Sequence, residues 1–396
     1  MSINIKGSRL RLTNYRVEIL LNNVIDKDLQ KMLLPLNIIQ CLTFCPKYQI
    51  RDNFITSNCR ALNVVSLLGT LVFTGILVIR ASLAFESYVP PAFFISQIVD
   101  SGSYFVGYII NFIVSIKYSE HNVKWVLAIQ DVHRSLNDES QFKSITIWTW
   151  IVSIFVTSAY IVYFIYFQIK VSTTTVNIGT LILSVFDFNI VYAIKLIKFL
   201  KSKVVLWNIE VVKTLELKNY DTKEYNDKMF EVIVKIFDCY KLFKVSFNHL
   251  ILYFILNVFT HTLLYTGLVL LIIDDKNPKE FIPNATLSAV SIYMWLAKGI
   301  LLQVILTQEC EKFYKAIENV QDTCAIVFKS GCSGSTGIFF FVDDMKRLCK
   351  NVQRLHRASF SKIQLFGLFQ VDAVLIVQMI SVITNYVIVM LQFIFL

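Results

Sequence analysis

The sequence predicts an all-α integral membrane protein with seven transmembrane helices. Of its 396 residues, 55% are hydrophobic and only 17% are charged, whereas soluble domains average about 25% charged residues. Apolar stretches long enough to cross a bilayer recur seven times, and lysines and arginines gather between alternate stretches. The N-terminal 23 residues are polar and of mixed charge, unlike a signal peptide, so we expect the first membrane segment to act as its own insertion signal.

The seven stretches follow from the thickness of the bilayer core, about 30 Å, which takes about 20 apolar residues of helix to cross. They are residues 61–84, 91–116, 144–169, 175–196, 243–273, 284–307 and 365–396. The fourth stretch carries Asp187 within its apolar run. The seventh is interrupted by Gly367 and Asp372, which predicts a short cytoplasmic helix joined to a membrane helix.

These stretches divide the chain into four regions. Residues 1–60 form an N-terminal region, in which the apolar run 32–44 is too short to span and predicts a re-entrant or interfacial helix. Residues 61–307 form a six-helix transmembrane bundle. Residues 308–374 are expected to form a cytoplasmic loop and an anchor helix, and residues 375–396 the seventh membrane helix.

The distribution of basic residues predicts the orientation. Thirty-three of the 38 lysines and arginines fall in the N-terminal 60 residues and in the loops 117–143, 195–244 and 306–364. Cytoplasmic loops carry such an excess, so the N-terminus is expected inside and the C-terminus outside. A seven-helix G-protein-coupled receptor has the opposite topology, which excludes that class. The sequon at Asn284 lies at the edge of the predicted external loop 274–283, in agreement with this orientation.

The cysteines give no sign of a metal or cofactor. All eight fall in segments predicted to be cytoplasmic, where thiols remain reduced. Their spacings match no zinc pattern. We therefore expect no metal, no cofactor and no extracellular disulfide.

The last membrane helix carries a strip of polar side chains. At about 100° per residue, Gln378, Ser381, Asn385 and Gln392 share a strip about 60° wide. Amides inside hydrocarbon need partners or water. Either the strip bonds to a neighbouring helix of the same chain, or several copies of this helix meet around a water-filled pore. Such a lining of amides and hydroxyls would discriminate poorly among small cations, and Leu391 and Phe393 would supply an apolar constriction.

A family resemblance supports the pore. Tyr386, five apolar residues, Gln392 and Phe393 resemble the C-terminal signature of insect gustatory receptors, Thr-Tyr followed by five apolar residues and Gln-Phe. Asn385 stands where that signature has Thr.

Two further segments carry the same resemblance. The run GLFQVD at 367–372 resembles the Gly-Leu-Phe-x-Ile-Asp that opens the family's last segment. LPL at 34–36 and FCP at 44–46 resemble its N-terminal pattern. Length and topology agree along the whole chain, whereas specific motifs cover only about 30 residues.

The resemblance implies a tetrameric, ligand-gated, nonselective cation channel whose last helix surrounds the central pore. Its partners would be a small-molecule tastant, permeating cations, membrane lipids, and either identical or related receptor subunits. It would lie in the plasma membrane of chemosensory neurons as a multi-pass protein. Gln392 and Phe393 would form the gate near the outer mouth. The expected pore and gate residues are Gln378, Ser381, Asn385, Val389, Gln392 and Phe393.

The outer halves of the first six membrane helices are expected to hold the ligand, because small-molecule sites are mostly apolar with a few convergent polar groups. Buried ionisable groups are costly, so Asp100 and Asp187 are better candidates than the aromatic residues. Arg80 could pair with Asp100 or extend to the external surface. Lys298 and Asp372 are expected in structural roles or in subunit contacts. The candidate ligand contacts are Gln97, Asp100, Tyr104, Tyr160, Tyr163, Asp187, His261, Tyr265, Tyr293 and Trp295.

The chemistry of these contacts favours bitter or amphipathic plant compounds. The family's sugar receptors resemble one another in a Glu after the signature Tyr, where this chain has Val387. The candidate contacts are rich in aromatic residues and poor in carboxylates, which suits apolar ligands better than polyols. A fructose-type receptor, which also lacks the Glu by resemblance, remains open.

Other classes fit less well. An insect odorant receptor shares the topology but lacks the Tyr-x5-Gln-Phe ending. A secondary transporter would show internal repeats, and none is visible. An enzyme is not expected, because no HExxH, GxSxG or paired-carboxylate motif occurs. Cytoplasmic loops near the lipid surface explain the net charge of +10, so no nucleic-acid partner is expected.

Overall fold

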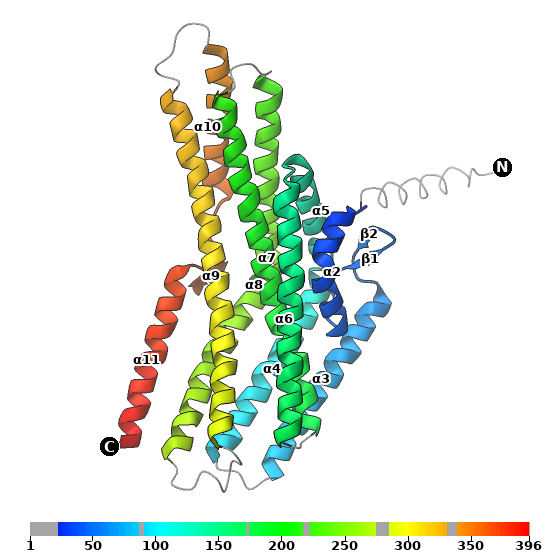
Figure 1. The fold of residues 1–396 in the computed structure, drawn as a ribbon, viewed down its shortest axis with the longest axis vertical. Coiled ribbons are helices and arrows are strands. Elements are labelled where there is room, and N and C mark those ends of the chain that lie inside the picture. The colour runs from blue at the N-terminus through cyan, green and yellow to red at the C-terminus, as the bar shows by residue number, and fades with distance from the viewer. Residues whose placement is uncertain are drawn as a thin grey trace, which may run out of the picture.

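The computed structural model describes residues 23–86, 91–171, 174–216, 222–274, 285–330 and 339–395. The described chain is a bundle of long helices with two small hairpins (Figure 1). The helices are α2 (Lys27–Leu42), α3 (Arg60–Glu86), α4 (Pro91–Lys117), α5 (Ser119–Ser135), α6 (Glu139–Val171), α7 (Thr174–Glu216), α8 (Thr222–Asp274), α9 (Ala285–Ser330), α10 (Phe339–Ser359) and α11 (Ala373–Phe395). The antiparallel hairpins pair β1 (Gln49–Arg51) with β2 (Phe54–Thr56), and β3 (Gln364–Leu365) with β4 (Phe369–Gln370).

Six of the described helices are long and apolar enough to cross a membrane: α3, α4, α6, α8, α9 and α11. Each coincides with one of the predicted stretches. The fourth predicted stretch, 175–196, lies on α7, which is helical but is not among the six. Its described side chains include Asp187, Lys195 and Lys198. Every side chain from Leu183 to Ile194 is buried by protein, so α7 is the central helix of the bundle. The orientation in the membrane stays a prediction.

The segment predicted as the cytoplasmic loop 195–244 and the segment predicted as a loop and anchor helix, 308–374, are mostly helical. In Figure 1, α7, α8 and α9 continue past the level at which α11 begins, and α10 packs beside them at the upper end. The reason is visible on α7, where Leu200, Val204, Trp207 and Val211 recur at helical spacing between the lysines and are buried. Lysines mark the end of the apolar stretch but not the end of the helix.

The predicted helix within 32–44 is confirmed as α2, which begins earlier, at Lys27. The predicted connection 117–143 between the second and third stretches contains α5. The two helices are tied together, because Arg134 donates two hydrogen bonds to the Asp26 carboxylate, at 2.9 and 2.7 Å. The Asp26 backbone N–H donates to Gln130 Oε1 at 2.7 Å. The re-entrant or interfacial placement of α2 stays a prediction.

The short helix predicted at the start of the seventh stretch was also wrong, because residues 364–370 form the β3–β4 hairpin. Gly367 sits in its turn with φ of 74°, a conformation that glycine adopts without steric cost. Asp372 then begins α11, since its carboxylate accepts hydrogen bonds from the backbone N–H groups of Val374 (3.0 Å) and Leu375 (3.3 Å). The structural role expected of Asp372 is therefore a helix cap.

Candidate functional site

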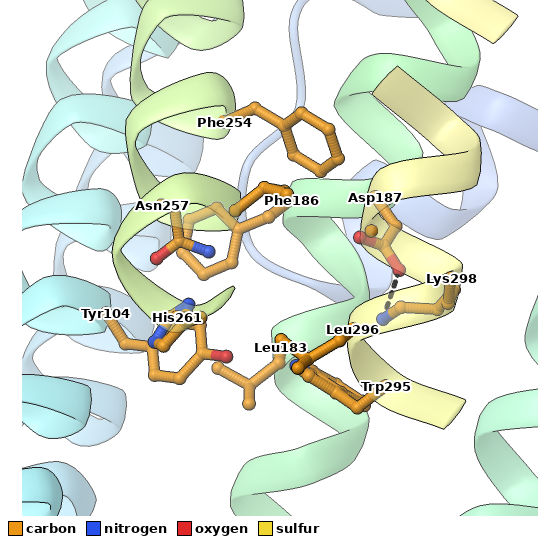
Figure 2. Close-up of a pocket in the computed structure, with 12 residues that line it drawn as sticks. Tyr104, Leu183, Phe186, Asp187, Phe254, Asn257, His261, Trp295, Leu296 and Lys298 are labelled. Atoms are coloured by element: carbon orange, nitrogen blue, oxygen red, sulfur yellow. Dashed lines mark ion pairs between the residues drawn. The ribbon is translucent and has the colours of Figure 1, made fainter. Parts of the chain in front are cut away.

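A small cavity lies inside the bundle between α4, α7, α8 and α9 (Figure 2). Its volume is about 30 Å³, room for about two water molecules. A drug-sized ligand needs about 300 Å³ or more, so a ligand could enter only if side chains moved. The lining residues are Tyr104, Leu183, Phe186, Asp187, Phe254, Asn257, Val258, His261, Trp295, Leu296, Lys298 and Gly299.

One side of the cavity holds an ion pair between two helices. Lys298 Nζ on α9 lies 2.6 Å from Asp187 Oδ2 on α7, drawn as a dashed line in Figure 2. The Tyr160 hydroxyl on α6 donates to the same Asp187 oxygen at 2.7 Å, and Lys298 lies 2.7 Å from that hydroxyl. Mutual contact offsets the cost of burying these charges.

The other side holds a second carboxylate. Asp100 on α4 is buried, and its Oδ1 lies 3.0 Å from His261 Nε2 and 2.6 Å from the Tyr265 hydroxyl, which donates to it. The rings of Tyr104 and Tyr265 both stack against the imidazole ring of His261, with centroid distances of 5.0 and 5.5 Å. His261 Nδ1 is buried and has no hydrogen-bond partner among the described residues. A polar group on a ligand could bond to it.

The structure brings most of the candidate ligand contacts to this region. Four of them line the cavity: Tyr104, Asp187, His261 and Trp295. Four more touch the lining residues: Asp100 and Tyr265 contact His261, Tyr160 contacts Asp187, and Tyr163 packs 5.6 Å from the Trp295 ring.

The other two candidate contacts belong neither to the cavity lining nor to the four residues that touch it. Gln97 is half-buried, and Tyr293 is 49% exposed on the outside of the bundle. The expected pairing of Arg80 with Asp100 rests on a side chain outside the described residues.

Sequence reasoning missed Lys298, which belongs to the cavity itself. It follows Trp295 by three residues and therefore shares its helix face; applying that spacing would have found it. Asn257 precedes His261 by four residues and lines the cavity for the same reason.

A larger groove lies on the outer surface between α3 and α4. Its volume is about 480 Å³. Its lining is largely apolar and includes none of the candidate ligand contacts: Leu77, Val78, Ala81, Ser82, Phe94, Ile98, Ser101, Gly102 and Phe105. A groove of this composition suits an acyl chain better than a polar ligand.

The pore candidates lie on α11, which descends along the side of the bundle from its middle to its lower end (Figure 1). Its inner face packs on α8 and α9 through Leu375 and Met379, which are buried. Gln303 on α9 donates to Met379 Sδ at 3.3 Å. Further along, Tyr386 lies against Gly267 of α8.

The polar strip lies about 110° around α11 from this packed face. Gln378, Ser381, Asn385 and Gln392 are all exposed, and Val389 is 46% exposed. The side chain of Phe393, the remaining pore candidate, lies outside the described residues. Among the described residues of one chain, therefore, no neighbouring helix covers the strip.

Comparisons with known proteins show which fold the chain shares. No family model and no curated protein matches the sequence. A solved structure of the insect olfactory receptor OR5 from Machilis hrabei, in complex with eugenol, is similar over 92% of this chain and 98% of that one. The TM-score is 0.58 and the sequence identity 14%. The chain has the fold of an insect olfactory receptor. At this identity the likeness shows the fold alone, so the gustatory assignment stays a prediction.

Proposed function

We propose that this protein is an insect gustatory receptor that acts as a ligand-gated, nonselective cation channel. Four copies, or this chain with related subunits, would place their α11 helices around a central pore. The observation that carries the proposal is the uncovered polar strip on α11. Exposed amides on a membrane helix are costly in lipid, and a water-filled axis between subunits removes that cost.

The bundle cavity is the proposed ligand site. Its lining is mostly aromatic and aliphatic, with His261 Nδ1 as a buried polar atom open to a new partner. Such a lining favours an amphipathic compound with one hydrogen-bonding group over a polyol, since a polyol would need many polar partners. Bitter plant metabolites have this chemistry.

An odorant receptor is the second candidate. The similar solved structure is an olfactory receptor in complex with eugenol, a small aromatic compound. The Tyr386–Phe393 ending instead favours the gustatory family. A fructose-type gustatory receptor is the third candidate, because Val387 does not distinguish it from a bitter receptor.

The deciding experiment is current recorded from excised patches of cells that express this chain alone, without GTP. Bitter plant compounds, eugenol and fructose would be applied in turn. We expect a cation current with bitter compounds. A response to eugenol alone would favour the odorant candidate, and a response to fructose alone the third. Confirmed surface expression without any current, alone or with related subunits, would contradict the channel.

A further inference from the structure

A second cavity lies where α11 begins, away from the bundle cavity. It is about 290 Å³ in volume, close to the lower limit of about 300 Å³ for ligand pockets. Three parts of the chain form it: the start of α5, one face of α8, and the segment that leads into the β3–β4 hairpin. The lining residues are Tyr118, Lys244, Val245, Asn248, His249, Ser361, Lys362, Gln364 and Phe366.

The cavity lies at one boundary of the candidate membrane segments. The candidate membrane segment of α4 ends at Lys117, immediately before Tyr118. The candidate membrane segment of α11 begins at Ala373, shortly after the hairpin. The hairpin turn presents Phe366 and Leu368 to the outside, with 54% and 66% exposed. Exposed apolar side chains beside a polar cavity are suited to the boundary between lipid tails and headgroups. By the distribution of lysines and arginines, this boundary is the cytoplasmic one.

The cavity is basic. Lys244 donates to Ser361 Oγ at 2.9 Å and Lys362 lies 3.9 Å from a Glu311 oxygen. Lys117 lies 5.4 Å from the ring of Tyr118. Of these three lysines, only Lys362 forms an ion pair among the described residues, so the site retains positive charge. An ammonium group carries three protons, and Lys244 can therefore hold both the hairpin and an anionic oxygen.

Two buried polar atoms at the cavity need partners. Asn248 Oδ1 and His249 Nδ1 have no hydrogen-bond partner in the part of the chain that the structure describes. Burying such atoms without partners costs free energy. A phosphate would suit the lysines and a neutral His249 ring that carries its N–H on Nδ1, whereas a ligand hydroxyl would suit Asn248 Oδ1.

We propose that this cavity binds a phosphorylated inositol group, which combines phosphates with hydroxyls, as the headgroup of a lipid in the cytoplasmic leaflet or as the free inositol phosphate. Basic pockets beside membrane helices bind such headgroups. The orientation rests on the proposed function. A bound group would bridge α8, through Lys244, and the segment before the hairpin, through Lys362. That segment leads through the hairpin into α11.

Native mass spectrometry of the purified full chain in detergent tests the proposal. The probes are a short-chain phosphatidylinositol bisphosphate, the free inositol trisphosphate, and a short-chain phosphatidylcholine of the same tail length. We expect the phosphoinositide to bind at least about tenfold more tightly than phosphatidylcholine. Equal binding of the free headgroup would assign the site to a soluble inositol phosphate; preference for the lipid would assign it to the membrane.

Variants locate the binding. Lys244→Gln/Lys362→Gln should weaken phosphoinositide binding at least about tenfold, whereas Arg347→Gln/Lys350→Gln, an equal charge change at two exposed positions of α10, should not. Because Lys244 also holds Ser361, Lys362→Gln alone serves as a second variant, and melting temperatures show that each variant is folded. Binding no tighter than phosphatidylcholine, or unchanged in both cavity variants, would overturn the proposal. Currents recorded in parallel test the channel separately, since it can conduct whether or not this cavity binds the lipid.

Discussion

Lys298 and Asp187 form an ion pair at the centre of the helix bundle, with 31% and 7% of their side chains exposed. The Lys298 ammonium also lies 3.5 Å from the centroid of the Trp295 ring, a distance at which a cation and an aromatic face attract. One lysine therefore joins α9 to α7 and, through Tyr160, to α6. Any ligand that enters the cavity meets this pair.

Removing Lys298 should destabilise the bundle, because it leaves the Asp187 carboxylate buried without a cation. Breaking a buried pair costs about 3–5 kcal/mol, and the partial exposure of Lys298 places the expected loss near the lower end. Lys298→Met should therefore lower the melting temperature in detergent by several degrees, while Asp187→Asn/Lys298→Met should recover most of it. Lys143→Met, from the exposed pair with Glu139, should change little. A double variant as unstable as the single one would contradict this role.

Gly107 should be intolerant of even one added methyl group. A Cβ there would overlap the hydroxyl of Tyr253 on α8, which donates to the Ser103 carbonyl at 3.2 Å. Gly107→Ala should therefore separate α4 from α8 and lower the melting temperature by several degrees, and adding Tyr253→Phe should not restore it, because the ring carbon Cζ and Phe186 would still overlap the added methyl group. Gly102→Ala on the same helix meets no atom within 4 Å and should be neutral or slightly stabilising. Equal melting temperatures for the two glycine variants would refute the close approach.

The sequence predicted the membrane helices well because bilayer crossing requires a long apolar run, which composition alone reveals. It predicted less well where helices continue past the apolar stretches. In those segments the lysines were interpreted as the end of the membrane helix, although Leu200, Val204 and Trp207 continue its helical spacing. The hairpin was missed because Gly367 was read as a helix interruption and not as a residue that supplies a positive φ in a turn.

The sequence also predicted part of the candidate site, because charged residues stand out in an apolar run. Buried charges such as Asp100 and Asp187 are recognisable in an apolar run, and both reach the cavity region. Which charges pair depends on how the helices are rotated relative to one another, and single helices do not reveal that. Lys298 was therefore assigned to structure, although it is the partner of Asp187.

Lys47 should give the protein a pH-dependent stability. It lies outside the membrane helices, and burial lowers its pKa to about 8 from an ordinary value of 10.5. Between these two values the unfolded chain holds a proton at this position that the folded chain has released, so stability should rise as the pH rises. The melting temperature of the unsubstituted chain should therefore increase between pH 8 and 10, and the increase should be smaller in Lys47→Met. Lys31→Met, at an exposed position on α2, should keep it. An increase between pH 8 and 10 that is as large in Lys47→Met as in the unsubstituted chain would contradict the assignment.

Asn385 should line the conducting pore, whereas Ile380 should not. Both are exposed in the single chain, but they lie about 140° apart around α11, so one pore axis cannot face both. A small cationic thiol reagent, applied from outside with the activating compound present, should block current through Asn385→Cys. It should leave Ile380→Cys and the unsubstituted chain unaffected, because Ile380 would face lipid or a neighbouring subunit. Modification of the two variants at the same rate would mean that α11 does not present its polar strip to the ion path.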